Sequence, residues 1–370
     1  MSALPPQVLI VGAGPTGLAA ALFLARRGVR ARVVDAAPGP TTTSKALAVN
    51  PRTLELLAET GVADRILSEG QHIGVIRIGT NGRVNTTVRP RWDRVAPGRP
   101  MTILPQARTE ALLAEALAEH GVRPEYDARL TGLIQTADTV TATLSPGETV
   151  TTALLLGADG AHSATRHALN LDFPGDASDL PWHLVDVEIE GAARDEARVD
   201  FQRAGPLITL PFAGGVFRII GFGDDLLPRL PAGWTPGRVL WRSEFKVSHR
   251  MVPTMAVGRV ALAGDAAHIH SPIGGRGMNL GIEDAFVFAV CAVDALNGDL
   301  SRIADYARVR HAVDAAWVKT SRGLTGFVAG QSPGVRLVKR IAPPIATSVP
   351  GLIEQALKRG LGLDHPTAVR

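Results

Sequence analysis

The fold of this chain is decided by residues 8–17, VLIVGAGPTG. The apolar run Gln7 to Val11 leads directly into a glycine-rich turn, and Pro15 to Arg27 follows with the spacing of a helix. A second apolar run, Ala31 to Asp35, completes the pattern. A glycine-rich turn between a strand and a helix is typical of a dinucleotide-binding βαβ unit, so we expect one in this segment.

The glycines of this turn have separate roles in holding a pyrophosphate. Gly12 permits the tight turn, Gly14 lets the backbone approach the phosphates, and Gly17 lets helix and strand pack closely. Asp35 ends the second strand, where a carboxylate accepts hydrogen bonds from a ribose diol and repels a 2′-phosphate. The segment therefore predicts a site for the ADP half of FAD or NAD. Its predicted contacts are Gly12, Gly14, Pro15, Thr16, Gly17, Asp35 and Ala36.

The composition indicates a folded protein with more than one domain. Of the 370 residues, 45% are hydrophobic and 20% are charged, which is ordinary for a globular protein. Single hydrophobic cores usually stop growing at about 250–300 residues, so we expect two domains. The 39 basic residues exceed the 35 acidic ones only slightly and are scattered, which argues against nucleic acid and favours small-molecule partners.

The cysteine content and the apolar runs bear on the cellular compartment. Cys291 is the only cysteine, which excludes an intrachain disulfide. Its apolar helical surroundings favour a small buried side chain over a reactive thiol. No uncharged apolar stretch reaches the roughly 18 residues that a membrane-spanning helix needs. We expect a cytoplasmic protein, either a monomer or a homodimer.

Two segments change in character to short strands and turns. Alternating residues on both sides of Asn81-Gly82, within Ile73 to Val88, predict a hairpin with a tight primed turn. From His183 to Lys246, short apolar runs are separated by Gly, Pro and Asp. These segments predict a β-rich domain that is inserted in two pieces.

The surrounding segments predict a discontinuous first domain. Helical spacing over Arg52 to Glu59 and over Gln106 to His120 belongs to it. We expect the first domain in residues 1–72, 105–172 and 254–322, the β-rich domain in 73–104 and 173–253, and a C-terminal segment in 323–370. That segment has the pattern of amphipathic basic helices, and we expect them to be broken at Pro343, Pro344 and Pro350.

Two further motifs follow predicted strands. The first is GADGAHSATR, residues 157–166, and the second is GDAAHIHSPIGGRGMN, residues 264–279. In the second, Asp265 precedes a glycine-rich turn and a helix that we expect to begin near Gly277. Asp265 can accept a hydrogen bond from a ribityl hydroxyl. The helix N-terminus can stabilise negative charge on a reduced flavin by about 0.3–2 kcal/mol.

The three motifs, in this order, resemble those of the class A flavoprotein monooxygenases, the family of p-hydroxybenzoate hydroxylase and the aromatic polyketide hydroxylases. The resemblance spans roughly residues 7–325. It implies an α/β fold in which a Rossmann-like FAD-binding domain carries an inserted β-sheet substrate domain and C-terminal helices. It also implies that FAD, O₂ and either NADPH or NADH are used to hydroxylate an aromatic or polyketide-like molecule, through a flavin C4a-hydroperoxide.

The resemblance further implies a set of site residues. Pro272, Gly274 and Gly275 should border the face of the flavin that reacts with oxygen. Asp159 and Gly160 should serve both FAD and the transiently bound nicotinamide. The other implied cofactor contacts are Lys45, Gln106, Arg108, Gly264, Asp265, Pro272, Gly275, Gly277, Met278 and Asn279.

Several features depart from the family pattern. Lys45 stands where the family usually has Arg after Ser, and a lysine offers phosphate a point charge instead of a bidentate fork. Arg276 stands where the family often has Gln. The sequence stops near residue 370, so we expect the form without the thioredoxin-like domain of larger members. We find no second glycine fingerprint. We therefore expect NAD(P)H to bind transiently at an open surface near Lys45, Arg166 and the turn Asp159–Gly160.

Other interpretations stay open at this point. His268 and His270 are two residues apart, but no third ligand has suitable spacing, so we expect no metal site. Trp182, Trp234 and Trp241 either pack inside the β-rich domain or offer a stacking face to a substrate. Alternatively, the protein is a flavoenzyme of the same fold that reduces, dehydrates or epoxidises its substrate, or a flavin-binding sensor without catalysis.

Overall fold

A five-stranded sheet lies at the centre of the first domain. The computed structural model describes residues 5–330, 332–349, 351–365 and 367. Strand β1 (Val8–Val11) pairs in parallel with β2 (Ala31–Val34) and with β11 (Leu154–Gly157). Strand β11 also pairs in parallel with β18 (Val260–Leu262), and β17 (Ala256–Val257) lies antiparallel at the edge. Each of the three motifs therefore follows one of three neighbouring strands, β1, β11 or β18.

The alternating side chains of β1 separate two hydrophobic cores. Val8 and Ile10 belong to the core that contains helix α1 (Pro15–Ala25), whereas Leu9 and Val11 belong to a second core. An antiparallel sheet that the sequence did not predict contributes to the second core. Its strands are β8 (Leu130–Gln135), β9 (Val140–Leu144) and β10 (Glu148–Thr152).

The remaining elements of the first domain surround α1. Helices α5 and α7 both pack against α1. The helix predicted over residues 52–59 is formed by α2 and a 3₁₀ turn, and the one predicted over 106–120 is α5. The helices and turns are α2 (Pro51–Leu56), η1 (Ala58–Thr60), α3 (Val62–Glu69), α5 (Gln106–Glu119), α6 (Ala164–Ala168), η4 (Gly264–Ala266) and α7 (Gly277–Leu296). A small sheet contains β3 (Ala48–Val49), β7 (Thr102–Ile103) and β4 (Gln71–His72).

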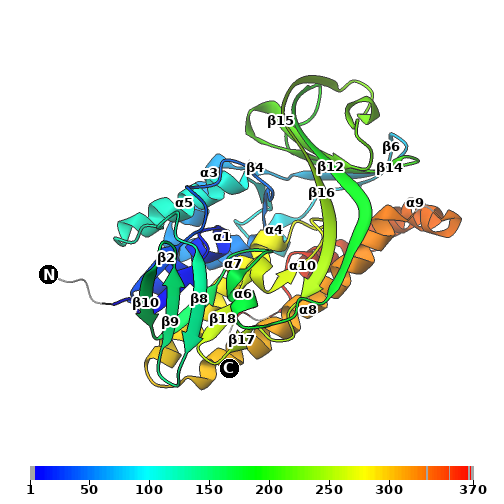
Figure 1. Ribbon diagram of the computed structural model, residues 1–370. Coiled ribbons are helices and arrows are strands. Elements are labelled where there is room, and N and C mark those ends of the chain that lie inside the picture. Colours follow the sequence, from blue (N-terminus) through cyan, green and yellow to red (C-terminus); the bar gives the residue numbers. More distant parts are fainter. Residues whose placement is uncertain (1–4, 331, 350, 366, 368–370) are drawn as a thin grey trace.

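An eight-stranded sheet joins the two β-rich pieces, in the order β19-β16-β12-β15-β14-β13-β5-β6. Strand β5 (Val75–Thr80), from the first piece, pairs in parallel with β13 (Glu196–Gln202) from the second. Figure 1 shows the long strands β12 (Gly175–Glu190) and β16 (Thr235–Met251) running from the first domain to the far end of this sheet. The other elements are β6 (Arg83–Val88), α4 (Trp92–Val95), β14 (Gly205–Pro211), η2 (Ala213–Gly215), β15 (Val216–Gly221), η3 (Leu227–Arg229) and β19 (His268–Ile269).

The predicted hairpin turn is confirmed between β5 and β6. Asn81 and Gly82 have φ angles of 49° and 83°, as a primed two-residue turn requires. Thr80 pairs with Arg83 on either side of the turn. This hairpin places the edge of the large sheet next to the C-terminal helices.

The C-terminal helices correct one prediction. Helix α8 (Ser301–Ala329) runs without interruption past residue 322, and α9 (Pro333–Ser348) continues through Pro343 and Pro344. The expected break at these two prolines is therefore wrong. An interior proline removes one backbone donor and its ring crowds the carbonyl four residues earlier, but the φ that it fixes is helical. Helix α9 is continuous through both prolines. Pro350 lies outside the described residues, and α10 (Leu352–Gly360) follows it.

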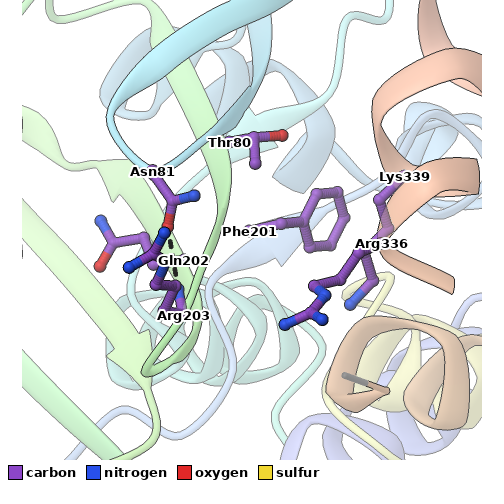
Figure 2. Close-up of a pocket in the computed structure, with 7 residues that line it drawn as sticks. All are labelled: Thr80, Asn81, Phe201, Gln202, Arg203, Arg336 and Lys339. Atoms are coloured by element: carbon purple, nitrogen blue, oxygen red, sulfur yellow. Dashed lines mark hydrogen bonds between the residues drawn. The ribbon is translucent and has the colours of Figure 1, made fainter. Parts of the chain in front are cut away.

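Lys339 connects helix α9 to the end of α8 and to the large sheet. Its Nζ donates to the carbonyl oxygens of Val328 (2.9 Å) and Gly330 (2.7 Å), and it lies 4.6 Å from the ring centre of Phe201. Figure 2 shows Phe201 between the hairpin and α9, in a small pocket. The pocket is lined by Thr80, Asn81, Phe201, Gln202, Arg203, Arg336 and Lys339.

The arrangement confirms the predicted α/β fold class, with a β-sheet domain inserted into a Rossmann-like domain. Among the described residues, no helix combines the length and the apolar character that crossing a bilayer requires. The position of the three motifs on one sheet edge is the feature that matters for function.

Candidate functional site

The three motifs meet at one edge of the parallel sheet. The carboxyl ends of β1, β11 and β18 lie side by side, so the turns that follow them are neighbours. If Gly12 had a side chain, its Cβ atom would lie only 2.2 Å from the carbonyl oxygen of Ala158. The first two motifs therefore touch at a position where only glycine fits. A Cβ at Gly264 would lie 2.7 Å from the hydroxyl oxygen of Thr16. Ligands bind at this edge in sheets of this type.

The turn after β1 leaves room for a phosphate group. A Cβ at Gly17 would lie 1.9 Å from the carbonyl oxygen of Gly12, whereas a Cβ at Gly14 would meet no atom within 4 Å. Gly17 is therefore needed for packing, and Gly14 faces open space. No described side chain caps α1, which begins with Pro15, so its first N–H groups are available to an anion. These features fit the pyrophosphate of a dinucleotide.

Asp35 is held in place at the end of β2. Its Oδ2 accepts a hydrogen bond from the backbone N–H of Ala13 (2.6 Å), and its Oδ1 accepts one from Ala37 (2.8 Å). These bonds tie the carboxylate to the turn after β1. Each oxygen keeps a lone pair for a further donor. Asp35 is thus available to accept a hydrogen bond from a ligand beside the turn after β1.

The segment that carries Lys45 is fixed from both domains. Gln106, the first residue of α5, accepts from the N–H of Ala46 through its side chain (3.0 Å) and donates its own N–H to the carbonyl of Ala46 (3.1 Å). From the sheet domain, Arg218 donates Nη1 to the carbonyl oxygen of Lys45 (2.8 Å). The backbone of Lys45 is therefore held while its side chain stays exposed.

Asp265 follows β18 and shares an electrostatic environment with Lys45. The surrounding protein raises the pKa of Asp265 by desolvation, and the positive charges of His268 and Lys45 oppose that shift. The side chain of Asp265 is nevertheless exposed. This combination is expected for a carboxylate that protein surrounds on most sides and solvent reaches on one. Asp265 is available to accept a hydrogen bond from a ligand.

The glycine-rich loop of the third motif presents backbone to the site. Gly274 and Gly275 have left-handed φ angles of 94° and 63°, and the N–H of Gly275 donates to the carbonyl of Pro272 (2.9 Å). Pro272 and Gly274 are exposed. Helix α7 begins at Gly277, as the sequence predicts. The loop therefore leads backbone groups and a helix N-terminus to the same place.

Asn279 joins this loop to two other parts of the site. Its Nδ2 donates to the carbonyl oxygens of Gly275 (2.7 Å) and Ala48 (2.8 Å). Its Oδ1 accepts from the N–H of Asn50 (2.9 Å) and the hydroxyl of Thr53 (2.7 Å). The hydrogen-bonding positions of this side chain are thereby occupied. The side chain of Asn279 is therefore not free to bind a cofactor, and only its backbone could do so. The neighbouring Met278 is largely buried.

A buried charge network lies beneath the third motif. Arg310 of α8 donates Nε to Asp284 (2.7 Å) and Nη2 to Asp314 (2.9 Å). His268 Nε2 lies 2.8 Å from Asp284 Oδ2, which also accepts from the N–H of Gly264 (2.9 Å). Burial alone would lower the pKa of His268, but the carboxylates of Asp314 and Asp284 raise it to about 9. The network anchors the start of the motif.

The same network brings together groups that could ligate a metal ion. Ligand atoms of His268, Asp284 and Asp314 lie within 4.8 Å of one another, a grouping that the spacing of His268 and His270 did not reveal. The guanidinium of Arg310 already donates to both carboxylates. The arrangement therefore fits a buried ion network better than a metal site.

Two predicted cofactor residues are engaged with the protein instead. Arg108 donates Nε and Nη2 to Glu69 (2.6 and 2.9 Å) at the surface of α5. Asp159 accepts from the hydroxyl of Ser163 (2.5 Å) and from the N–H of Thr165 (3.0 Å), within its own turn. Contact of either side chain with a cofactor would require these bonds to be shared or exchanged, so both assignments stay predictions.

The expectation that Arg166 lies at an open surface is wrong. Arg166 is 3% exposed, and its guanidinium donates to the carbonyl oxygens of Ala266 (3.0 Å) and Ala161 (2.9 Å). It also lies 4.0 Å from the ring centre of Phe173. Arg166 therefore links the second motif to the third, and burial lowers its pKa.

Burial decides between the alternatives for Trp182 and for Cys291. Trp182 is 1% exposed and packs edge-on against Phe222, with ring centres 4.5 Å apart, so it is a packing residue. Cys291 is fully buried, and burial raises the pKa of its thiol to about 11. The burial of Cys291 therefore agrees with a small buried side chain and not with a reactive thiol.

Sequence reasoning missed two buried charged positions near the site. Arg218 of β15 forms a bidentate pair with Asp186 of β12, at 2.8 Å for both Nε and Nη2. The charged residue inside the apolar run VFRIIG, residues 216–221, could have signalled it. The second position is Glu110, which lies one helical turn after Gln106. Burial raises the pKa of Glu110 to about 7, although the hydrogen bond that Gln106 donates to it lowers the pKa.

Comparison with known proteins adds to this geometry. A family model described as "FAD binding domain" matches residues 6–215 and 228–321. The chain is 35% identical over 367 residues to 6-methylpretetramide 4-monooxygenase of Streptomyces rimosus, a match that covers 93% of the chain and 65% of that relative. It is 34% identical over 305 residues to rifampicin monooxygenase of Streptomyces venezuelae, covering 76% of the chain and 62% of that relative.

A solved structure shows the same arrangement. The anhydrotetracycline hydroxylase OxyS from Streptomyces rimosus superposes with a TM-score of 0.81 at 27% identity, over 98% of this chain and 77% of that chain. The chain spans just under two thirds of the length of the curated relatives named above, at 65% and 62%. The overall fold is therefore shared over almost the whole of the present sequence, and the match to the FAD binding domain model ends at residue 321.

Proposed function

This chain belongs to the FAD binding domain family of the class A flavoprotein monooxygenases, and on that premise we propose that it is an FAD-dependent monooxygenase. It would use NADPH or NADH and O₂ to hydroxylate an aromatic or polyketide-like small molecule. The observation that carries the proposal is the convergence of three motifs at the ends of β1, β11 and β18. The first motif alone would serve a simple nucleotide-binding module, so the other two favour an enzyme.

The residues present fit FAD. Gly14 and the N-terminus of α1 would hold the pyrophosphate, Asp35 the adenosine ribose and Asp265 the ribityl chain. The loop Pro272–Gly277 and the start of α7 would lie along the flavin ring. When bound, FAD supplies hydride acceptance from the nicotinamide and the activation of O₂.

The chain itself would orient the substrate against the flavin, supply charge beside it and exclude water from the site. Gly274 and Gly275 would border the reacting face with backbone atoms alone, and Pro272 with a saturated ring. No nucleophilic side chain of these three residues would intercept an electrophilic oxygen. Arg218 ties the Lys45 segment to the large sheet. Residues of both domains would therefore bound the substrate. The exposed amine of Lys45 would meet NAD(P)H transiently at the surface.

We also propose a cytoplasmic location. The sequence has a single cysteine, Cys291, which suits a reducing compartment. Its burial protects the thiol from oxidation.

The oligomeric state is a separate expectation, either a monomer or a homodimer. Light scattering of the purified protein would decide between the two.

Turnover in labelled oxygen tests the proposed activity. FAD-loaded protein is mixed with NADPH or NADH and a panel of phenols and polycyclic phenolic polyketides under ¹⁸O₂. The proposal predicts substrate-dependent consumption of the nicotinamide and a product that carries one ¹⁸O atom. Consumption with a changed but unlabelled product would identify a flavoenzyme of the same fold that does not hydroxylate. A protein that binds FAD but is never reduced would support the sensor alternative.

A further inference from the structure

After α10 the chain returns to the glycine-rich loop through the turn Leu361–His365, called here the 361–365 turn. Arg52 of α2 holds this turn, because its Nε donates to the carbonyl of Gly362 (3.0 Å) and its Nη2 to the carbonyl of His365 (2.9 Å). Gly362 has a φ of 74°, and a Cβ there would lie 2.2 Å from Nη2 of Arg276. The turn is therefore packed directly against the loop of the third motif.

His365 is connected to Arg276 through Glu283. His365 Nε2 lies 2.7 Å from Oε2 of Glu283, whose Oε1 accepts from Nη2 of Arg276 (2.9 Å). Glu283 is fully buried on α7. Burial alone would raise the pKa of Glu283, but the hydrogen bond from His365 and the charges of Arg310 and Arg276 hold it below its ordinary value. Glu283 is therefore an ionised link between the turn and the loop.

Arg276 depends on this link for its position. Its guanidinium lies 4.7 Å from the ring centre of Trp317, and its Nε has no hydrogen-bond partner among the described residues. Glu283 also has a partner in Arg310. Nη1 of Arg310 lies 3.4 Å from Oε2 of Glu283, the same oxygen that His365 contacts. Loss of His365 would let Glu283 move toward Arg310. Arg276 would then lose its hydrogen bond to Glu283.

We propose that the 361–365 turn is a strap that positions the glycine-rich loop, and that His365 is a positioning residue that acts on Arg276 through Glu283. Only the assignment of this loop to FAD rests on the proposed function. Helix α10 packs against α4 and α9. The strap therefore also connects the loop to the β-rich domain and to the C-terminal helices.

Hydrogen exchange tests the strap in the full chain, with and without FAD. The variants are His365→Ala, which removes the contact to Glu283, and His365→Gln, whose amide can still donate to it. Gln355→Ala, on the exposed side of α10, is the matched control. We expect amides of residues 274–280 to exchange roughly tenfold faster in His365→Ala, because a charge-assisted hydrogen bond that restrains them is lost. Exchange should be close to wild type in His365→Gln and in Gln355→Ala.

A second readout links the strap to the cofactor. The dissociation constant for FAD, from fluorescence titration, should rise several-fold in His365→Ala and recover in His365→Gln. Unchanged loop exchange in His365→Ala would overturn the strap, and so would faster exchange that spreads equally to β8–β10. Faster loop exchange in a protein that binds no FAD would support the strap while it refuted the proposed function, so the two ideas fail separately.

Discussion

Replacing Glu110 with Gln should stabilise the protein at alkaline pH and change its stability less at pH 5. Glu110 is 6% exposed, and burial raises its pKa from the ordinary 4.5 to about 7, although the hydrogen bond from Gln106 opposes the shift. The folded state therefore favours the neutral acid. The contribution of Glu110 to stability is fully present below about pH 4.5 and is lost as the pH rises through about 7.

The magnitude follows from the two pKa values. One pKa unit corresponds to about 1.4 kcal/mol, so ionisation of Glu110 costs the folded state about 3 kcal/mol at pH 8. About 2.5 kcal/mol of this cost accumulates between pH 5 and pH 8. Urea unfolding at pH 5, 6.5 and 8 compares the wild type with Glu110→Gln and with Glu119→Gln, an exposed position on the same helix. A stability difference for Glu110→Gln that stayed constant with pH, or that Glu119→Gln reproduced, would refute the reasoning.

Three further predictions concern the cofactor and the sheet domain. Asp265→Ala should weaken FAD binding by about 1–3 kcal/mol, roughly ten- to hundredfold, in a titration of the apoprotein; unchanged affinity would show that the third motif is misassigned. Asp186→Ala should lower the free energy of unfolding by about 3–5 kcal/mol, because Arg218 is left buried and unpaired. The double variant Asp186→Leu/Arg218→Met should recover most of that loss in urea unfolding, and failure to recover would point to a cause other than charge. FAD is expected to be held non-covalently, so acid denaturation should release all of it, and a yellow precipitate would contradict this.

Much of the first domain could be predicted because its signals are local. The β1-α1-β2 unit follows from an apolar run, a glycine-rich turn and a helical repeat, which depend on neighbouring residues alone. The hairpin at Asn81-Gly82 is similar, since two left-handed residues between alternating runs have few other solutions. The start of α7 at Gly277 also follows from local glycine chemistry.

The unpredicted features depend on partners far apart in the sequence. Arg310 meets Asp284 and Asp314 because α7 and α8 pack together, and no local pattern marks that contact. Arg218 and Asp186 pair across two strands whose register the sequence does not reveal. The sequence predicts only short strands between His183 and Lys246, whereas β12 and β16 extend beyond these residues because the two strands pair with each other.

The central claim, that the turn after β1 holds the pyrophosphate of FAD, is tested most directly by Gly14→Ala. Gly14 has an ordinary extended backbone, with φ −75° and ψ −176°, and an added Cβ would meet no protein atom within 4 Å. Gly323→Ala, in α8, also adds a Cβ that meets no atom and is the matched control. We predict that both variants keep the melting temperature of the wild-type apoprotein or exceed it slightly, and that only Gly14→Ala binds FAD roughly tenfold or more weakly, since the methyl group occupies the space of the phosphates. Equal FAD affinity of Gly14→Ala and the wild type would contradict the account.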